Sequence, residues 1–126
     1  METTGASRKK PAYFIGSALA DLRRFSEDVQ DEFGKAILKA QWGGKAVQAK
    51  PLKGFGGAGV LEIVAEDDGS TFRAVYTVRF AGAVYVLHVF QKKSNRGIAT
   101  APHDTDTVRR RLRAAEEHYA EQFPSE

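Results

Sequence analysis

The chain has 126 residues, of which 42% are hydrophobic, and a net charge of +3. This length and composition suit one globular domain with a substantial core. The lack of cysteine excludes disulfides, thiolate zinc sites and cysteine nucleophiles. No apolar run approaches the roughly 20 residues of a membrane helix, and the first residues lack the apolar core of a signal peptide. We expect a cytoplasmic protein with a flexible basic tail at residues 1–11 and a single domain at residues 12–123.

A short strand and two helices are predicted for the first third of the chain. Residues 12–15 are β-prone and follow a proline, and Ser17 and Ser26 are suitable helix N-caps. The sequence predicts helices over 17–25 and 27–42, folded as a hairpin. Their expected buried stripe has apolar residues three and four positions apart: Leu22, Phe25, Val29, Phe33, Ile37 and Leu38.

Three β-patterned runs follow a glycine-rich connection at residues 43–58. The glycines of this connection match no nucleotide-binding fingerprint, so we interpret it as a simple loop. The strands are expected at 59–66, 71–80 and 83–93. The letters DDGS between the first two are a strong turn signal, and Ala81-Gly82 suits a two-residue hairpin loop between the last two.

A C-terminal helix completes the predicted domain. Asp104 or Thr105 is expected to cap it, and it is expected to end near Phe123. The whole pattern predicts an α+β fold, in which an N-terminal helical hairpin packs on a small, mostly antiparallel sheet. The expected buried stripe of the last helix is Val108, Leu112, Ala115, Tyr119 and Phe123.

Strand periodicity gathers polar side chains on one face of the predicted sheet. If Phe80 pairs with Ala83, and Glu66 with Thr71, alternate residues of the strands share a solvent-exposed face that is opposite the core. The residues expected on this open face are Glu62, Arg73, Arg79, His88 and Lys92.

Each of these residues also has an ordinary structural interpretation. Glu62 and Arg73 suit a cross-strand ion pair that contributes under about 1 kcal/mol. His88 lies between two apolar residues, as a half-buried structural histidine does. Lys92 and Lys93 suit a solvated strand end.

Four segments together resemble the RelE/ParE superfamily of type II toxins, and most closely its phage-derived HigB-like branch. They occur in the family's order between residues 13 and 112: FSEDVQDEFGKAI, KPLKGFGGAGVLEI, FRAVYTV and LHVFQKKS. The resemblance implies a RelE-like fold and, for many members, cleavage of mRNA on the ribosome. It also implies an antitoxin partner, for which we expect a helix-turn-helix protein.

The resemblance also implies roles for particular residues. Arg73 matches the arginine that contacts the scissile phosphate in RelE-like enzymes, and Glu62 matches an acidic position of the HigB-like branch. Lys92, Lys93 and Arg96 lie where the family has basic residues after its last strand. Val64 departs from the family pattern, because many HigB-like members have a basic residue there.

RNA scission by the ribose 2′-OH needs a base, an acid and cations, and it needs no metal or cofactor. We therefore expect the catalytic set Arg73, Glu62, His88 and Lys92, in which Glu62 or His88 is the base. The remaining cations between residues 50 and 96 are expected to bind RNA: Lys50, Lys53, Arg79, Lys93 and Arg96.

Two alternatives to an RNase remain open at this point. ParE-like relatives share the fold but poison DNA gyrase by binding it, and fold alone does not separate the two activities. A non-catalytic member that only binds RNA or a protein is the other alternative. The expected partners of the RNase are the antitoxin, the ribosome and mRNA, with no membrane. The antitoxin is expected to cover either the open face or the helical hairpin.

Overall fold

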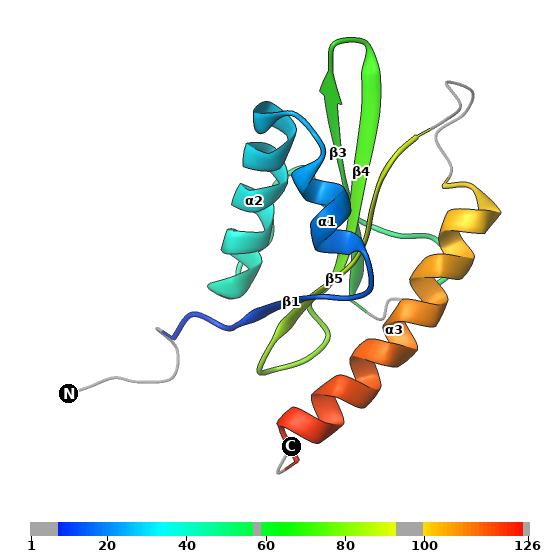
Figure 1. Cartoon of the computed structure of the whole chain (residues 1–126). Helices are drawn as coiled ribbons and strands as arrows, with labels where there is room; N and C mark the ends of the chain where they lie inside the picture. Colours follow the sequence, from blue (N-terminus) through cyan, green and yellow to red (C-terminus); the bar gives the residue numbers. More distant parts are fainter. Residues whose placement is uncertain (1–7, 57–58, 93–99, 125–126) are drawn as a thin grey trace.

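The protein is a sheet enclosed between two helical layers in a computed structural model that describes residues 8–56, 59–92 and 100–124 (Figure 1). Helices α1 and α2 cover one face of the sheet, and α3 covers the other. The predicted α+β architecture is confirmed. Residues 1–7 of the predicted tail lie outside the described part. The elements are β1 (Ala12–Phe14), α1 (Ala18–Arg23), α2 (Glu27–Gln41), β2 (Lys50–Pro51), β3 (Val60–Asp67), β4 (Ser70–Thr77), β5 (Val84–Gln91) and α3 (Pro102–Gln122).

The five strands form one sheet in the order β1-β5-β4-β3-β2. β1 is parallel to β5, and every other neighbouring pair is antiparallel. Strand β2 was not predicted, because it contributes only Lys50 and Pro51 within a glycine-rich connection. Lys50 pairs with Glu62 of β3. The connection is therefore partly a sheet edge, which places a lysine beside an acidic residue.

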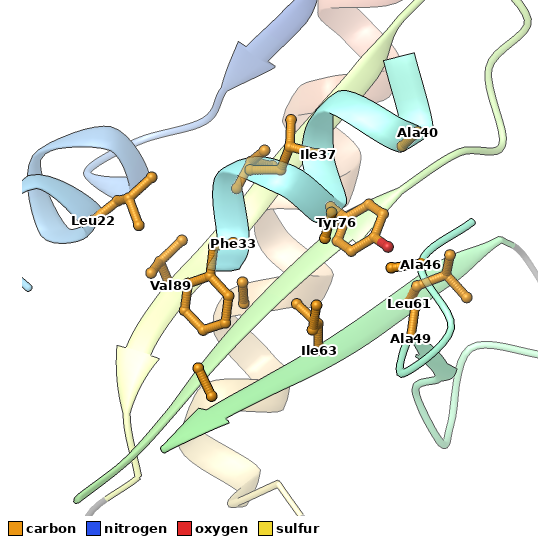
Figure 2. Packing of buried hydrophobic residues seen from close by; sticks show 14 of the residues in the cluster. Leu22, Phe33, Ile37, Ala40, Ala46, Ala49, Leu61, Ile63, Tyr76 and Val89 are labelled. Carbon is orange, nitrogen blue, oxygen red and sulfur yellow. The ribbon is translucent and has the colours of Figure 1, made fainter. Parts of the chain in front are cut away.

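The larger core lies between α2 and the sheet. Phe33 and Ile37 of α2 pack towards Tyr76 and Ile63 of the central strands (Figure 2). The expected burial of Leu38 was wrong, since this side chain is 45% exposed. Leu38 lies about 100° around the helix from Ile37, outside the buried stripe.

The helix starts follow local capping chemistry only in part. Ser26 accepts a hydrogen bond from the Val29 amide at 3.3 Å, as predicted. Ser17 makes no such bond, and its hydroxyl instead donates to Asp21. Helix α3 begins earlier than expected, with Ala101 as N-cap and a proline in the first turn. Proline fits there because the first helical amide needs no partner.

The connection between β4 and β5 differs from the predicted two-residue loop. The strands end and begin at Thr77 and Val84, so residues 78–83 connect them. Arg73 nevertheless pairs with Phe90, as predicted, because the register shifts between Val75 and Tyr76 of β4. The shift is a β-bulge that leaves Leu87 as an extra residue on β5. A bulge turns the chain so that neighbouring side chains leave their strict alternation.

The second core lies between α3 and the sheet face that carries Arg73, which we call the α3 face. Val108, Leu112 and Ala115 of α3 pack on Val75 and Leu87 of the sheet. The buried stripe predicted for this helix is thus confirmed, with Tyr119 and Phe123 partly buried. The prediction of an open face was wrong, because α3 covers it. No helix in the described residues is long and apolar enough to cross a membrane.

Candidate active site

An ion pair and a hydroxyl form the first part of the site on the α3 face. Nη1 of Arg73 donates to Oε1 of Glu62 at 3.0 Å and to the Thr100 hydroxyl at 3.3 Å. The same hydroxyl donates to Oε2 of Glu62 at 2.6 Å. Glu62 and Arg73 meet because Glu62 pairs with Val75, two residues beyond Arg73 on β4. Arg73, Glu62 and Thr100 thus bond to one another in a closed network, and Thr100 lies two residues before the start of α3.

A histidine and an aspartate form the second part. His88 of β5 lies opposite Val75, so it shares the α3 face with Arg73. Its Nε2 lies 2.8 Å from Oδ1 of Asp104 in the first turn of α3. The bulge at Leu87 is what turns His88 towards α3. Without it, strict alternation from Leu87 would direct His88 to the opposite face.

Burial determines the protonation of His88. Loss of solvent lowers the pKa of His88, and the hydrogen bond and charge of Asp104 oppose this effect without reversing it. The imidazole is therefore neutral at pH 7. Since the Asp104 carboxylate accepts, Nε2 carries the proton and Nδ1 has the free lone pair. Among the described residues, this buried Nδ1 has no hydrogen-bond partner.

An arginine on α3 supports the bulge behind His88. Nη1 of Arg111 donates to the carbonyl of Leu87, the bulge residue, at 3.0 Å, and Nη2 donates to Ser17 at 3.1 Å. Gly16 has a φ of +59°, and an added Cβ there would lie 2.9 Å from Nε of Arg111. Glycine at this position leaves room for the guanidinium. Arg111 thus ties α1, β5 and α3 together next to His88.

Arg73 is buried, which corrects the expectation of a solvent-facing position. The residue is 5% exposed, and among the described residues its Nε has no hydrogen-bond partner. The sequence pattern located it correctly by strand and register. It missed the burial because α3 and Thr100, distant along the chain, close over that face. A ligand phosphate would reach the guanidinium by replacing Thr100.

Comparisons with known proteins show the family of the chain and a solved structure with the same fold. Residues 20–113 match the family described as Phage derived protein Gp49-like (DUF891). The chain belongs to this family. A double mutant of the E. coli toxin RelE in the free state has the same fold, with a TM-score of 0.57 and 17% identity over 82% of this chain and 98% of that chain. None of the curated proteins compared with the chain matches it significantly.

The expected relation to the RelE/ParE superfamily, in a phage-derived branch, is thereby confirmed. The other predicted residues of this Gp49-like protein are dispersed around the site. Lys92 lies at the end of β5, two residues beyond Phe90, and its amide donates to Thr71. Lys50 and Lys53 are exposed near the β2 edge. Arg79 lies on the same side of the sheet as Arg73, but it is exposed and pairs with Glu116 of α3 at 2.7 Å. Lys93 and Arg96 lie outside the described residues.

No role in the site was predicted from the sequence for Thr100, Asp104 or Arg111. Asp104 was interpreted only as a helix cap, and Arg111 was not singled out at all. The signal for Asp104 was weak, because the helix dipole favours a carboxylate in a first helical turn but does not predict a partner on another strand. Arg111 had none, because its partners are backbone and hydroxyl groups from other parts of the chain.

Proposed function

We propose that this Gp49-like protein is the toxin of a type II toxin–antitoxin pair, and that it is a metal-independent, ribosome-dependent mRNA endoribonuclease. The observation that carries the proposal is the gathering of Arg73 and a neutral His88 with a free Nδ1 on one sheet face. A fixed cation and a free base are two of the groups that 2′-OH attack on a phosphate requires.

In this proposal each side chain has a separate role. Arg73 binds the scissile phosphate, because a guanidinium stays charged and bonds two oxygens at once. Once substrate entry exposes its buried Nδ1, His88 takes the 2′ proton there while Asp104 holds Nε2 and fixes the tautomer. The 2′ oxygen then bonds to phosphorus as the bond to the 5′ oxygen breaks, and the 5′ oxygen leaves with a proton from solvent water. Glu62 is a poor base, because both of its oxygens accept hydrogen bonds. Its role is to position Arg73, and Lys92 at the strand end contacts a neighbouring phosphate.

The buried network also supports dependence on a larger partner. Substrate must displace Thr100 from Arg73, which costs the free protein two hydrogen bonds. A ribosome that holds the mRNA in place supplies the orientation that offsets this cost. Such an enzyme acts in the cytoplasm, where an antitoxin, expected to be a helix-turn-helix protein, restrains it.

Expression in a bacterium tests the proposal. We expect growth arrest with cuts in translated mRNA, and we expect Arg73→Lys to reduce cleavage by about 100-fold. Lysine keeps a cation beside Glu62 but loses the planar fork, so the fold should survive. Arg73→Ala is a poorer test, because it leaves the Glu62 carboxylate without its cation. Arg24→Lys, in an exposed ion pair with Asp21 at 3.4 Å, is the matched control.

Other outcomes of the same experiment identify the alternatives. Arrest with intact mRNA and trapped gyrase–DNA complexes would favour a gyrase poison. Folded protein that neither arrests growth nor cuts mRNA would favour a non-catalytic binder. Mapping of 5′ ends in mRNA and melting curves of each variant separate these cases from simple unfolding.

A further inference from the structure

Five exposed cations come from three parts of the chain that meet at α3, and we call this set the α3 flank. Nη1 of Arg109 reaches the carbonyl of Gly54 in the β2–β3 connection at 3.4 Å. Glu116 pairs with Arg79 at 2.7 Å. Arg113 lies between these contacts, four residues after Arg109 and three before Glu116, on the same helix side. The flank consists of Lys50, Lys53, Arg79, Arg109 and Arg113.

An aromatic ring is part of the same surface. The guanidinium of Arg109 lies 4.8 Å from the centroid of the Phe55 ring. Phe55 is half-buried and Arg109 is exposed. Stacking on a ring holds a guanidinium plane in place and leaves its N–H edges available. The pair offers both a charge for a phosphate and a partner for a base.

The flank leads towards the buried network. Lys50 pairs with Glu62 across β2 and β3, and Glu62 holds Arg73. Lys53 follows three residues later, next to Gly54 and the Arg109 contact. A chain of anions bound along α3 would therefore continue towards Arg73.

We infer that the α3 flank binds single-stranded RNA on the approach to Arg73, an inference that rests on the proposed function. Among the described residues, the acidic groups on this helix side are Glu116, which is paired with Arg79, and the exposed Asp106 and Glu117, so the five cations outnumber them. Arg109 and Arg113 are about 6 Å apart along the helix axis, a spacing comparable to that of successive phosphates on an extended strand. Cations beside an aromatic ring are typical of surfaces that bind single strands.

Binding of a labelled 16-nucleotide RNA with 2′-O-methyl groups tests the inference by fluorescence anisotropy. This RNA lacks the attacking hydroxyl, so binding is measured whether or not the protein is an RNase. We expect the double variant Arg109→Gln and Arg113→Gln to bind about tenfold more weakly at 0.1 M salt. The slope of log affinity against log salt should fall by about 1.4, since each phosphate contact on a single strand contributes about 0.7.

The matched control changes two exposed arginines next to each other at the end of α1, on the opposite face of the sheet, Arg23→Gln and Arg24→Gln. Its net charge equals that of the test variant, and we expect near wild-type affinity. Equal losses in both variants would overturn the inference, because only net charge would then matter. Unchanged RNA affinity with weaker binding of poly-glutamate would overturn it in favour of an acidic protein partner. If the test variant binds RNA more weakly than the control, but mRNA stays intact in the expression test, the result would support RNA binding by the α3 flank and contradict only the RNase proposal.

Discussion

At the scale of single residues, the polar groups of the α3 face depend on burial for their chemistry. Arg73 is paired with Glu62 and hydrogen-bonded to Thr100. A ligand phosphate must therefore compete with these two groups for the guanidinium. His88 is held neutral by loss of solvent, with Asp104 fixing one nitrogen. Tyr85 shows the same effect, since burial, followed by its neighbours Tyr13 and Tyr119, raises its pKa to about 12.

Stability should depend on the protonation of His88. Its folded-state pKa lies below that of the unfolded chain, so the unfolded state binds the proton more readily. Stability is thus fully present above about pH 6.5 and falls as the pH drops from there towards the folded-state pKa. We expect chemical denaturation to show a smaller loss between pH 7.5 and 5.5 in His88→Gln than in the wild type. His103→Gln, an exposed position, is the control, and an equal loss in all three proteins would contradict the assignment.

At the scale of elements, the start, the middle and the end of α3 each make a different contact with the sheet. Its first turn carries Asp104 to His88, and its middle packs Leu112 into the second core. Near its end, the Tyr119 hydroxyl accepts a hydrogen bond from the Gly82 amide. The close approach of Gly82 leaves no room there, since an added Cβ would lie 3.0 Å from the Tyr119 oxygen. The helix thereby connects the candidate site to the far end of the sheet.

Truncating the centre of α3 should destabilise the whole domain. Leu112 is 9% exposed, and we expect Leu112→Ala to lower the free energy of unfolding by about 2–5 kcal/mol, through lost burial and a residual cavity. Leu38→Ala provides the contrast, because that leucine of α2 is 45% exposed and should cost less than about 1 kcal/mol. Urea denaturation of both variants measures the difference. Similar losses would mean that the α3 layer contributes little to the core.

At the scale of the whole molecule, the sheet separates two surfaces of different character. The α3 side carries the flank cations and the buried network. The α2 side carries a groove of about 470 Å³ between the helix and the loop that follows it. Asp28, Asp31 and Glu32 line this groove with two lysines and the exposed Val47, so it does not favour a purely acidic segment. The groove along α2 and the surface over Arg73 therefore suit partners of different charge.

The layered arrangement predicts unequal protection from hydrogen exchange. β4 lies inside the sheet, with helical layers on both of its faces, and its amides should exchange most slowly. The first turns of α3 pack through few apolar side chains and should exchange faster. Access to Arg73 requires motion there, so Asp104→Asn should speed exchange in this segment while β4 stays protected. Hydrogen–deuterium exchange with mass spectrometry measures the exchange rates of the two segments. Equal protection of β4 and of the first turns of α3 would contradict the expectation that these turns move to give access to Arg73.

Local patterns were sufficient for the elements and for most of the register. Three- and four-residue spacing located both long helices, and the DDGS turn predicted the pairing of Glu66 with Thr71, which is confirmed. That register placed Glu62 beside Arg73, and their ion pair follows from it. These features depend on neighbours in sequence or on one tight turn, where Asp68 and Gly69 adopt positive φ. Features that depend on neighbouring residues can therefore be predicted from the sequence alone.

Contacts between distant segments were decided only by the tertiary structure. Arg111 of α3 donates to the carbonyl of the bulge residue Leu87, and Asp104 of α3 bonds His88. Packing of α3 also buried Arg73 and paired Arg79 with Glu116. Strand alternation gives the face of a side chain, but whether that face meets water or other protein groups depends on residues far along the chain, such as Thr100, which lies 38 positions after Glu62. The sequence by itself thus determined which groups share a face, and the tertiary structure decided which of them are buried, paired and free to react.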